Sequence, residues 1–172
     1  MHIFIVGPRH VGKSTLIQKV IQEIGLPVWG FATKKEDDLR DEELGSPIYI
    51  YDADQPRIQT EENLVGYCKD HHFQTNIEIF NNFAKRMTAP PSEDVLILMD
   101  EIGFMESKAE DFCNWIFQHL DGDIPVIAAV KDKSTPFLDA VKSHPNCKCF
   151  YIEEDNRDAL CQIVSDFVKE QL

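Results

Sequence analysis

The sequence lacks the features that mark membrane proteins, disulfide-stabilised proteins and proteins that bind nucleic acid. No apolar run is long enough to cross a bilayer, and the apolar beginning MHIFIVG is followed at once by Pro8 and Arg9. The five cysteines are scattered without a paired CxxC spacing, which argues against a disulfide framework and a zinc site. We therefore expect a cytoplasmic protein with free thiols.

Positive charge is also scarce. The chain has 17 Lys and Arg against 30 Asp and Glu, for a net charge of -13. Such a field repels polyanions, so neither nucleic acid nor a membrane is expected as a partner, and the sequence points to no protein partner. Any phosphate-binding site in this chain must therefore be locally positive.

The length of 172 residues predicts one domain that spans residues 1–172. Hydrophobic residues make up 43% of the chain, which is ordinary for a globular protein. One folding unit is therefore enough to account for the sequence, and no linker is required.

Short apolar runs alternate with segments whose apolar residues recur every three or four positions. The strand-like runs are residues 2–6, 27–33, 48–54, 95–100, 125–130 and 148–152. The helical segments lie within residues 13–24, 77–87, 112–120, 137–141 and 160–168. Strands that are apolar throughout and alternate with helices predict an α/β fold of three layers, with a mostly parallel central sheet and helices on both faces.

Three finer expectations accompany this fold. The charge-rich stretch 34–46 reads as a solvated loop or a protruding hairpin. Alternation in the run 148–152 places Cys147 and Cys149 on one strand face as core thiols. Ile163 is expected on the buried stripe of the last helix.

Residues 7–14, GPRHVGKS, match the phosphate-loop pattern G-x-x-x-x-G-K-[ST] between a buried strand and a helix. Glycines let the backbone wrap around phosphate, and the helix N-terminus adds its positive end. Lys13 would neutralise the β and γ oxygens, the Ser14 hydroxyl would ligate Mg²⁺, and Thr15 would donate to the α-phosphate. The candidate nucleotide-binding residues here are Gly7, Pro8, Arg9, His10, Val11, Gly12, Lys13, Ser14 and Thr15. Arg9 and His10 are expected to offer backbone rather than side-chain contacts.

A second motif, VLILMDEIG at 95–103, ends a buried strand with two carboxylates. Ligands bind at the carboxyl edge of an open parallel sheet, where this strand would deliver them. Asp100 is placed to hold Mg²⁺, and Glu101 is placed to orient or deprotonate the attacking water.

Several motifs together resemble the small P-loop nucleoside-triphosphatase family found in thermophilic prokaryotes and in animals, which has thermophile-type and cancer-related members. They are the phosphate loop, Gly30, Phe31 and Thr33 of the GF.T stretch, DEIGFMES at 100–107, Phe112, and DNRDAL at 155–160. The resemblance implies a RecA-like P-loop NTPase fold and slow Mg²⁺-dependent hydrolysis of ATP, GTP and other triphosphates to the diphosphate and phosphate. It also implies that Glu101 activates water, that Met105 and Glu106 lie by the active site, and that Asn156 and Arg157 lie near the nucleotide.

The chain departs from the family pattern in two places. After Thr33 the family usually has an acidic residue, a glycine and an arginine, whereas here two lysines at 34–35 precede the acidic run. After the strand at 125–130 the family tends to have a histidine and basic residues, whereas here KDK stands at 131–133. Lys131 is our candidate for the cation that senses the γ-phosphate.

Other functions use the same loop and sheet. A nucleotide or small-molecule kinase transfers phosphate to a hydroxyl instead of water, although this chain has no cluster of arginines in a lid-like segment. A nucleotide-dependent switch module would order the loops at 34–46 or 104–110 around the γ-phosphate. The role of Arg157 also stays open between transition-state stabilisation, stacking on a base and a surface salt bridge.

Overall fold

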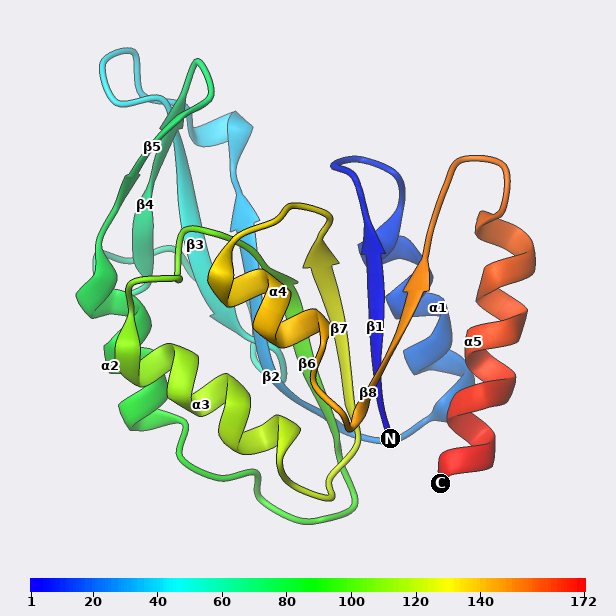
Figure 1. The fold of residues 1–172 in the computed structure, drawn as a ribbon. Helices are drawn as coiled ribbons and strands as arrows, with labels where there is room; N and C mark the ends of the chain where they lie inside the picture. Colours follow the sequence, from blue (N-terminus) through cyan, green and yellow to red (C-terminus); the bar gives the residue numbers. More distant parts are fainter.

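The computed structural model describes residues 1–172, which form one eight-stranded sheet between two layers of helices (Figure 1). The strands are β1 (His2–Gly7), β2 (Val28–Lys35), β3 (Ser46–Asp52), β4 (Leu64–Lys69), β5 (His72–Thr75), β6 (Leu96–Ile102), β7 (Val126–Lys131) and β8 (Cys147–Tyr151). The helices are α1 (Lys13–Ile24), α2 (Ile77–Arg86), α3 (Glu110–Leu120), α4 (Pro136–Lys142), α5 (Arg157–Gln171) and the short 3₁₀ helix η1 (Asp37–Leu39). No helix is long and apolar enough to span a membrane.

The strand order β5-β4-β3-β2-β6-β7-β1-β8 divides the sheet into two parts. Strands β2, β6, β7, β1 and β8 run parallel to their neighbours. Strands β3, β4 and β5 are added antiparallel beyond β2. The predicted α/β fold with a mostly parallel sheet is therefore confirmed, and the antiparallel part is an extension of it.

In the antiparallel part, sequence periodicity identified β3 but missed β4 and β5. The largely exposed HFQT of β5 carries no continuous apolar run, and Gly66 interrupts the short run of β4. The hairpin expected at 34–46 is confirmed, because this stretch joins the antiparallel strands β2 and β3. Lys34 and Lys35 end β2, Ser46 begins β3, and the exposed residues between them form η1 and a turn with an Asp41–Gly45 bridge.

Each central strand has apolar side chains on both faces, which explains its unbroken apolar run. Phe4 and Val6 of β1 pack into the core under α2, α3 and α4, whereas Ile3 and Ile5 pack into the core under α1 and α5. Side chains alternate along a strand, so four consecutive apolar residues serve two separate cores. The layers in Figure 1 follow directly from this pattern.

Gly30 of the GF.T stretch lets β2 lie close to β6. A Cβ atom at this position would lie 2.1 Å from the Leu98 carbonyl oxygen, and the backbone has a φ of 126°. The next residue, Phe31, packs against Phe112 with ring centroids 5.1 Å apart. This part of the family motif therefore maintains the sheet and its core, next to the strand that carries the acidic pair.

Two expectations about partly buried positions had different outcomes. Cys147 and Cys149 do pack together against the core under α2, α3 and α4, as alternation along β8 predicted. Ile163 is 54% exposed, so its predicted place in the core was wrong. The buried stripe of α5 instead runs through Leu160, Val164 and Val168 and does not reach Ile163.

Candidate active site

The central strands bring the phosphate loop and the acidic pair to the same edge of the sheet, at the top of Figure 1. In the sheet register, Ile5 and Asp100 both pair with Ala129, because β7 lies between β1 and β6. Gly12 ends the loop with a φ of 105°, and α1 begins at Lys13. The edge of the sheet thus carries loop and carboxylates side by side, as ligand sites in open parallel sheets require.

The Lys13 ammonium lies in the mouth of the phosphate loop. Its Nζ donates hydrogen bonds to the carbonyl oxygens of Gly7 and Pro8, both at 2.8 Å. It also lies 3.1 Å from Glu101 Oε2, and its side chain is only 5% exposed. The loop lysine and the water-activating candidate are therefore in direct contact, although 88 positions separate them in the sequence.

Ser14 and Asp100, the two predicted metal ligands, are also in contact. The Ser14 hydroxyl donates a hydrogen bond of 3.0 Å to Asp100 Oδ1. A third residue joins them: Lys34 Nζ lies 2.7 Å from Asp100 Oδ2 and 3.2 Å from Ser14 Oγ. The hydroxyl and carboxylate oxygens fit a hard cation such as Mg²⁺, which takes few protein ligands and completes its shell with phosphates and water.

Glu101 stands between two cationic groups. Its Oε2 faces Lys13, and its Oε1 lies 3.9 Å from Lys131 Nζ. The side chain is 25% exposed, so water reaches it. A carboxylate in this position can orient a water molecule while the neighbouring ammonium groups neutralise charge that develops on a phosphate.

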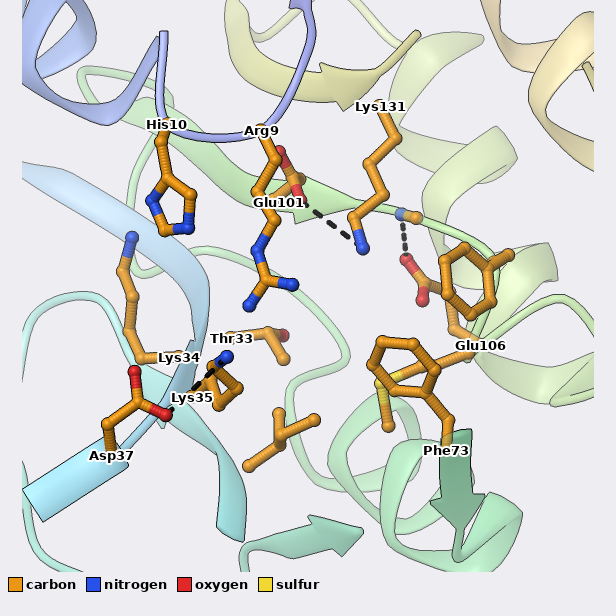
Figure 2. A pocket seen from close by; sticks show the side chains of 14 residues that line it. Arg9, His10, Thr33, Lys34, Lys35, Asp37, Phe73, Glu101, Glu106 and Lys131 are labelled. Carbon is orange, nitrogen blue, oxygen red and sulfur yellow. Dashed lines mark hydrogen bonds and ion pairs between the residues drawn. The ribbon is translucent and has the colours of Figure 1, made fainter. Parts of the chain in front are cut away.

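Beyond Glu101 the site opens into a cavity of about 280 Å³, shown in Figure 2. Its lining includes four basic side chains, Arg9, Lys34, Lys35 and Lys131, and three acidic ones, Asp37, Glu101 and Glu106. The convergence of the basic side chains gives this acidic protein the local positive field that a phosphate site needs. We name it the cationic cavity.

An aromatic wall closes one side of the cationic cavity. Phe73 and Phe104 meet edge to face with centroids 4.8 Å apart, and Lys131 Nζ lies 4.5 Å from the Phe104 centroid. Burial lowers the pKa of Lys131, against the opposing effect of Glu101 and Glu106. The ammonium is thus held by a ring face and by nearby carboxylates.

Glu106 also lines the cavity and is buried, with 4% exposure. Its Oε1 accepts a hydrogen bond from the Gly103 backbone N–H, which ties the DEIGFMES segment into a tight turn. Burial raises the pKa of Glu106 to about 7, more than the Gly103 hydrogen bond and Lys131 lower it. The predicted place of Glu106 beside the active site agrees with the geometry.

On the other side of the loop, Arg157 borders a separate hollow of about 190 Å³. A Cβ atom at Gly12 would lie 3.4 Å from Arg157 Cδ, so the arginine covers the last glycine of the loop. Thr15 lines both this hollow and the pocket at the phosphate loop. None of the salt bridges involves Arg157, which argues against the surface salt bridge considered from the sequence.

Asn156 has a local role in the structure. Its Oδ1 accepts a hydrogen bond from the Glu153 backbone N–H, and its Nδ2 donates to the Tyr151 carbonyl oxygen. Both contacts stabilise the turn that leads from β8 into α5. Asn156 thereby orients the start of the helix that carries Arg157, and its own amide group is already engaged.

Sequence reasoning missed part of the site. Lys34 and Lys35 were noted only as departures from a family pattern, and Phe73 was in a segment with no assigned element. Arg9 and His10 were expected to offer only backbone contacts, yet their side chains line the cationic cavity, and Arg9 points into it in Figure 2. The one available signal was the unusual pair of lysines that follows the GF.T stretch.

Comparisons with known proteins identified similar sequences and a similar fold. The family described as NTPase matches residues 2–165. The cancer-related nucleoside-triphosphatase homolog of Mus musculus is 30% identical, with 92% of each chain covered. The nucleoside-triphosphatase THEP1 of Thermotoga petrophila is 28% identical over 93% of this chain and 88% of its own. Among solved structures, a human cancer-related nucleoside triphosphatase superposes with a TM-score of 0.66 at 21% identity, over 98% of this chain and 97% of its own.

Proposed function

This chain belongs to the NTPase family, and from that premise we propose that it hydrolyses ATP, GTP and other nucleoside triphosphates to the diphosphate and phosphate, with Mg²⁺ bound. It is a nucleoside-triphosphate hydrolase, as its relatives are named. The observation that carries the proposal is the contact of 3.1 Å between Lys13 of the phosphate loop and Glu101 of the acidic pair. That contact supports the proposal, because Lys13 would bind phosphate and Glu101 would orient the attacking water beside it.

The phosphates would lie in the loop between Gly7 and Thr15. Backbone N–H groups of the loop and the N-terminus of α1 would hold their oxygens, and the Lys13 ammonium would exchange its carbonyl partners for phosphate. The hollow beside Arg157 continues from the loop at Gly12 and Thr15, so we assign the nucleoside to that side. The terminal phosphate then points towards Glu101.

Ser14 and Asp100 are the residues that would hold Mg²⁺, whose chemistry is to neutralise phosphate oxygens. Glu101 would orient the attacking water and accept its proton at a carboxylate oxygen. Lys13 and Lys131 would stabilise the negative charge on the transferring phosphate from both sides of Glu101. We infer these roles from the contacts that each side chain makes.

The proposal is tested by phosphate release from a panel of triphosphates, with and without Mg²⁺. Wild-type protein should release phosphate only with the metal, whereas Lys13→Ala and Glu101→Gln should lose this activity. Glu23→Gln is the matched control, because Glu23 pairs with Lys169 far from the site. Equal rates for wild type and Glu101→Gln would contradict the proposed role of the carboxylate.

The cationic cavity favours a second candidate function, phosphoryl transfer to an anionic acceptor. It adjoins Glu101 on the side away from the nucleoside hollow, where an acceptor hydroxyl would replace the attacking water. Its cations would hold an acidic group of the acceptor, and Phe73 and Phe104 would cover an apolar part. ADP formation that exceeds phosphate release in the presence of hydroxylated carboxylates or phosphates would support transfer. Equal amounts of both products throughout the panel would exclude these acceptors.

A further inference from the structure

Lys34 places its ammonium group between the two side chains that would hold the metal. Its Nζ lies 2.7 Å from Asp100 Oδ2 and 3.2 Å from Ser14 Oγ. Mg²⁺ binds oxygen at about 2.1 Å, so an ion held by Ser14 and Asp100 would lie close to this ammonium group. Two cations so close together repel each other, so each weakens the binding of the other.

The charge of Asp100 explains why a cation is held there in the protein without nucleotide. The carboxylate is 2% exposed and sits at the end of β6, so it needs a positive partner in place of water. Lys13 is engaged with Gly7, Pro8 and Glu101, which leaves Lys34 to supply that charge.

The sheet register puts Lys34 within reach. Ala32 of β2 pairs with Asp100 of β6, and Lys34 follows two residues later near the end of the strand. Its side chain is 24% exposed and borders the cationic cavity, so it can withdraw from Asp100 without disturbing either core. The phosphates of a bound nucleotide would offer the displaced ammonium a new partner.

We propose that Lys34 is a built-in competitor of the metal: its ammonium occupies the Ser14–Asp100 site in the free protein and leaves when Mg²⁺ enters with the nucleotide. This inference rests on the proposed function, because it uses the metal ligands assigned there. It goes further by making metal binding depend on nucleotide binding. Lys34, the first residue after the GF.T stretch, thus couples the two ligands.

The test uses Mn²⁺ as a spectroscopic probe, titrated into the full-length protein without nucleotide and followed by electron paramagnetic resonance. Lys34→Met should bind Mn²⁺ about tenfold more tightly than wild type, which is a usual size for coupling between two ligands. Lys85→Met is the matched control, since Lys85 pairs with Asp111 at 3.5 Å, does not line the site and should leave the affinity unchanged. Equal affinities for wild type and Lys34→Met would overturn the proposal.

Two further variants separate this inference from the metal assignment itself. In Lys34→Met with Asp100→Asn, the added Mn²⁺ affinity should disappear. If it persists, the ion lies elsewhere and the proposed metal ligands are wrong. If the Mn²⁺ affinity depends on Asp100 but is unchanged by the loss of Lys34, the metal ligands are right and only the proposed competition by Lys34 is wrong.

Lys34→Arg keeps the test decisive even if Lys34→Met does not fold. A guanidinium group matches a carboxylate with two parallel hydrogen bonds and should be harder to displace than an ammonium. This variant should bind Mn²⁺ more weakly than wild type by about threefold or more and should need more Mg²⁺ for half-maximal phosphate release. Binding as tight as that of wild type would overturn the competition.

Discussion

The two sides of Glu101 are built in different ways. On one side, the phosphate loop and Lys13 come from one contiguous segment and use mainly backbone groups. On the other side, the cationic cavity gathers Arg9, Lys34, Lys35 and Lys131 from three separate segments. The first arrangement follows from the phosphate-loop pattern, whereas the second depends on side chains from separate parts of the chain. The loop side should therefore contribute more to activity than the cavity side.

The largest expected effect lies on the loop side. Lys13→Ala should lower kcat by about 100-fold to 1,000-fold, the usual cost of removing one group that stabilises transition-state charge. Steady-state phosphate release measures this, with circular dichroism to confirm that the variant is folded. A change in KM with kcat intact would show that Lys13 holds the ground state and the transition state equally.

A second prediction concerns Glu106, which also lines the cationic cavity. Its pKa is raised by burial from an ordinary value of 4.5 to about 7, so the folded protein binds this proton more tightly than the unfolded chain. The resulting stability is complete below pH 4.5 and is lost as the pH rises through 7, by about 3 kcal/mol in total.

Glu106→Gln removes this titration and should make the protein more stable than wild type at pH 8, but not at pH 4. Urea unfolding at both pH values measures the difference. Glu153→Gln, an exposed acid on the surface, is the control and should change stability little at either pH. Parallel stability curves for wild type and Glu106→Gln across this range would show that Glu106 does not titrate as described.

Lys131→Met tests the cavity side directly. The ammonium lies 3.9 Å from Glu101 Oε1, so its loss should remove charge stabilisation on the terminal phosphate and lower kcat about tenfold. Lys133→Met is the control, because Lys133 lies over the outer part of the same wall, 5.2 Å from the Phe104 centroid, and does not line the cavity. Equal kcat values for Lys131→Met and wild type would show that only the loop side stabilises the charge on the terminal phosphate.

The smallest effect is expected at the nucleoside hollow. Arg157→Ala should raise KM by roughly threefold to tenfold and leave kcat unchanged, as for the loss of one exposed contact worth about 1 kcal/mol. Initial rates over a range of ATP and GTP concentrations measure both constants. A fall in kcat at constant KM would instead place the guanidinium on the transferring phosphate.

Prediction from sequence succeeded for motifs and strands that consist of neighbouring residues. Residues 7–15 contain the loop, its lysine and its hydroxyl, and the apolar run before Asp100 identified a buried strand that ends in a carboxylate. The hairpin of β4 and β5 was missed, because β5 is largely exposed and polar and β4 is a short run interrupted by Gly66. Ile163 was misplaced because helical spacing alone does not say how wide the buried stripe is.

The sequence by itself determined the phosphate loop and the parallel order of strands and helices, since both depend on local patterns of glycine, lysine and apolar residues. Only the tertiary structure decided that Lys34 meets Asp100 and that Arg9 and Lys131 face one cavity. These contacts bring together residues that are distant in the chain. The physical reason is that charge pairing acts across space, and a lysine has no sequence signature that names its partner.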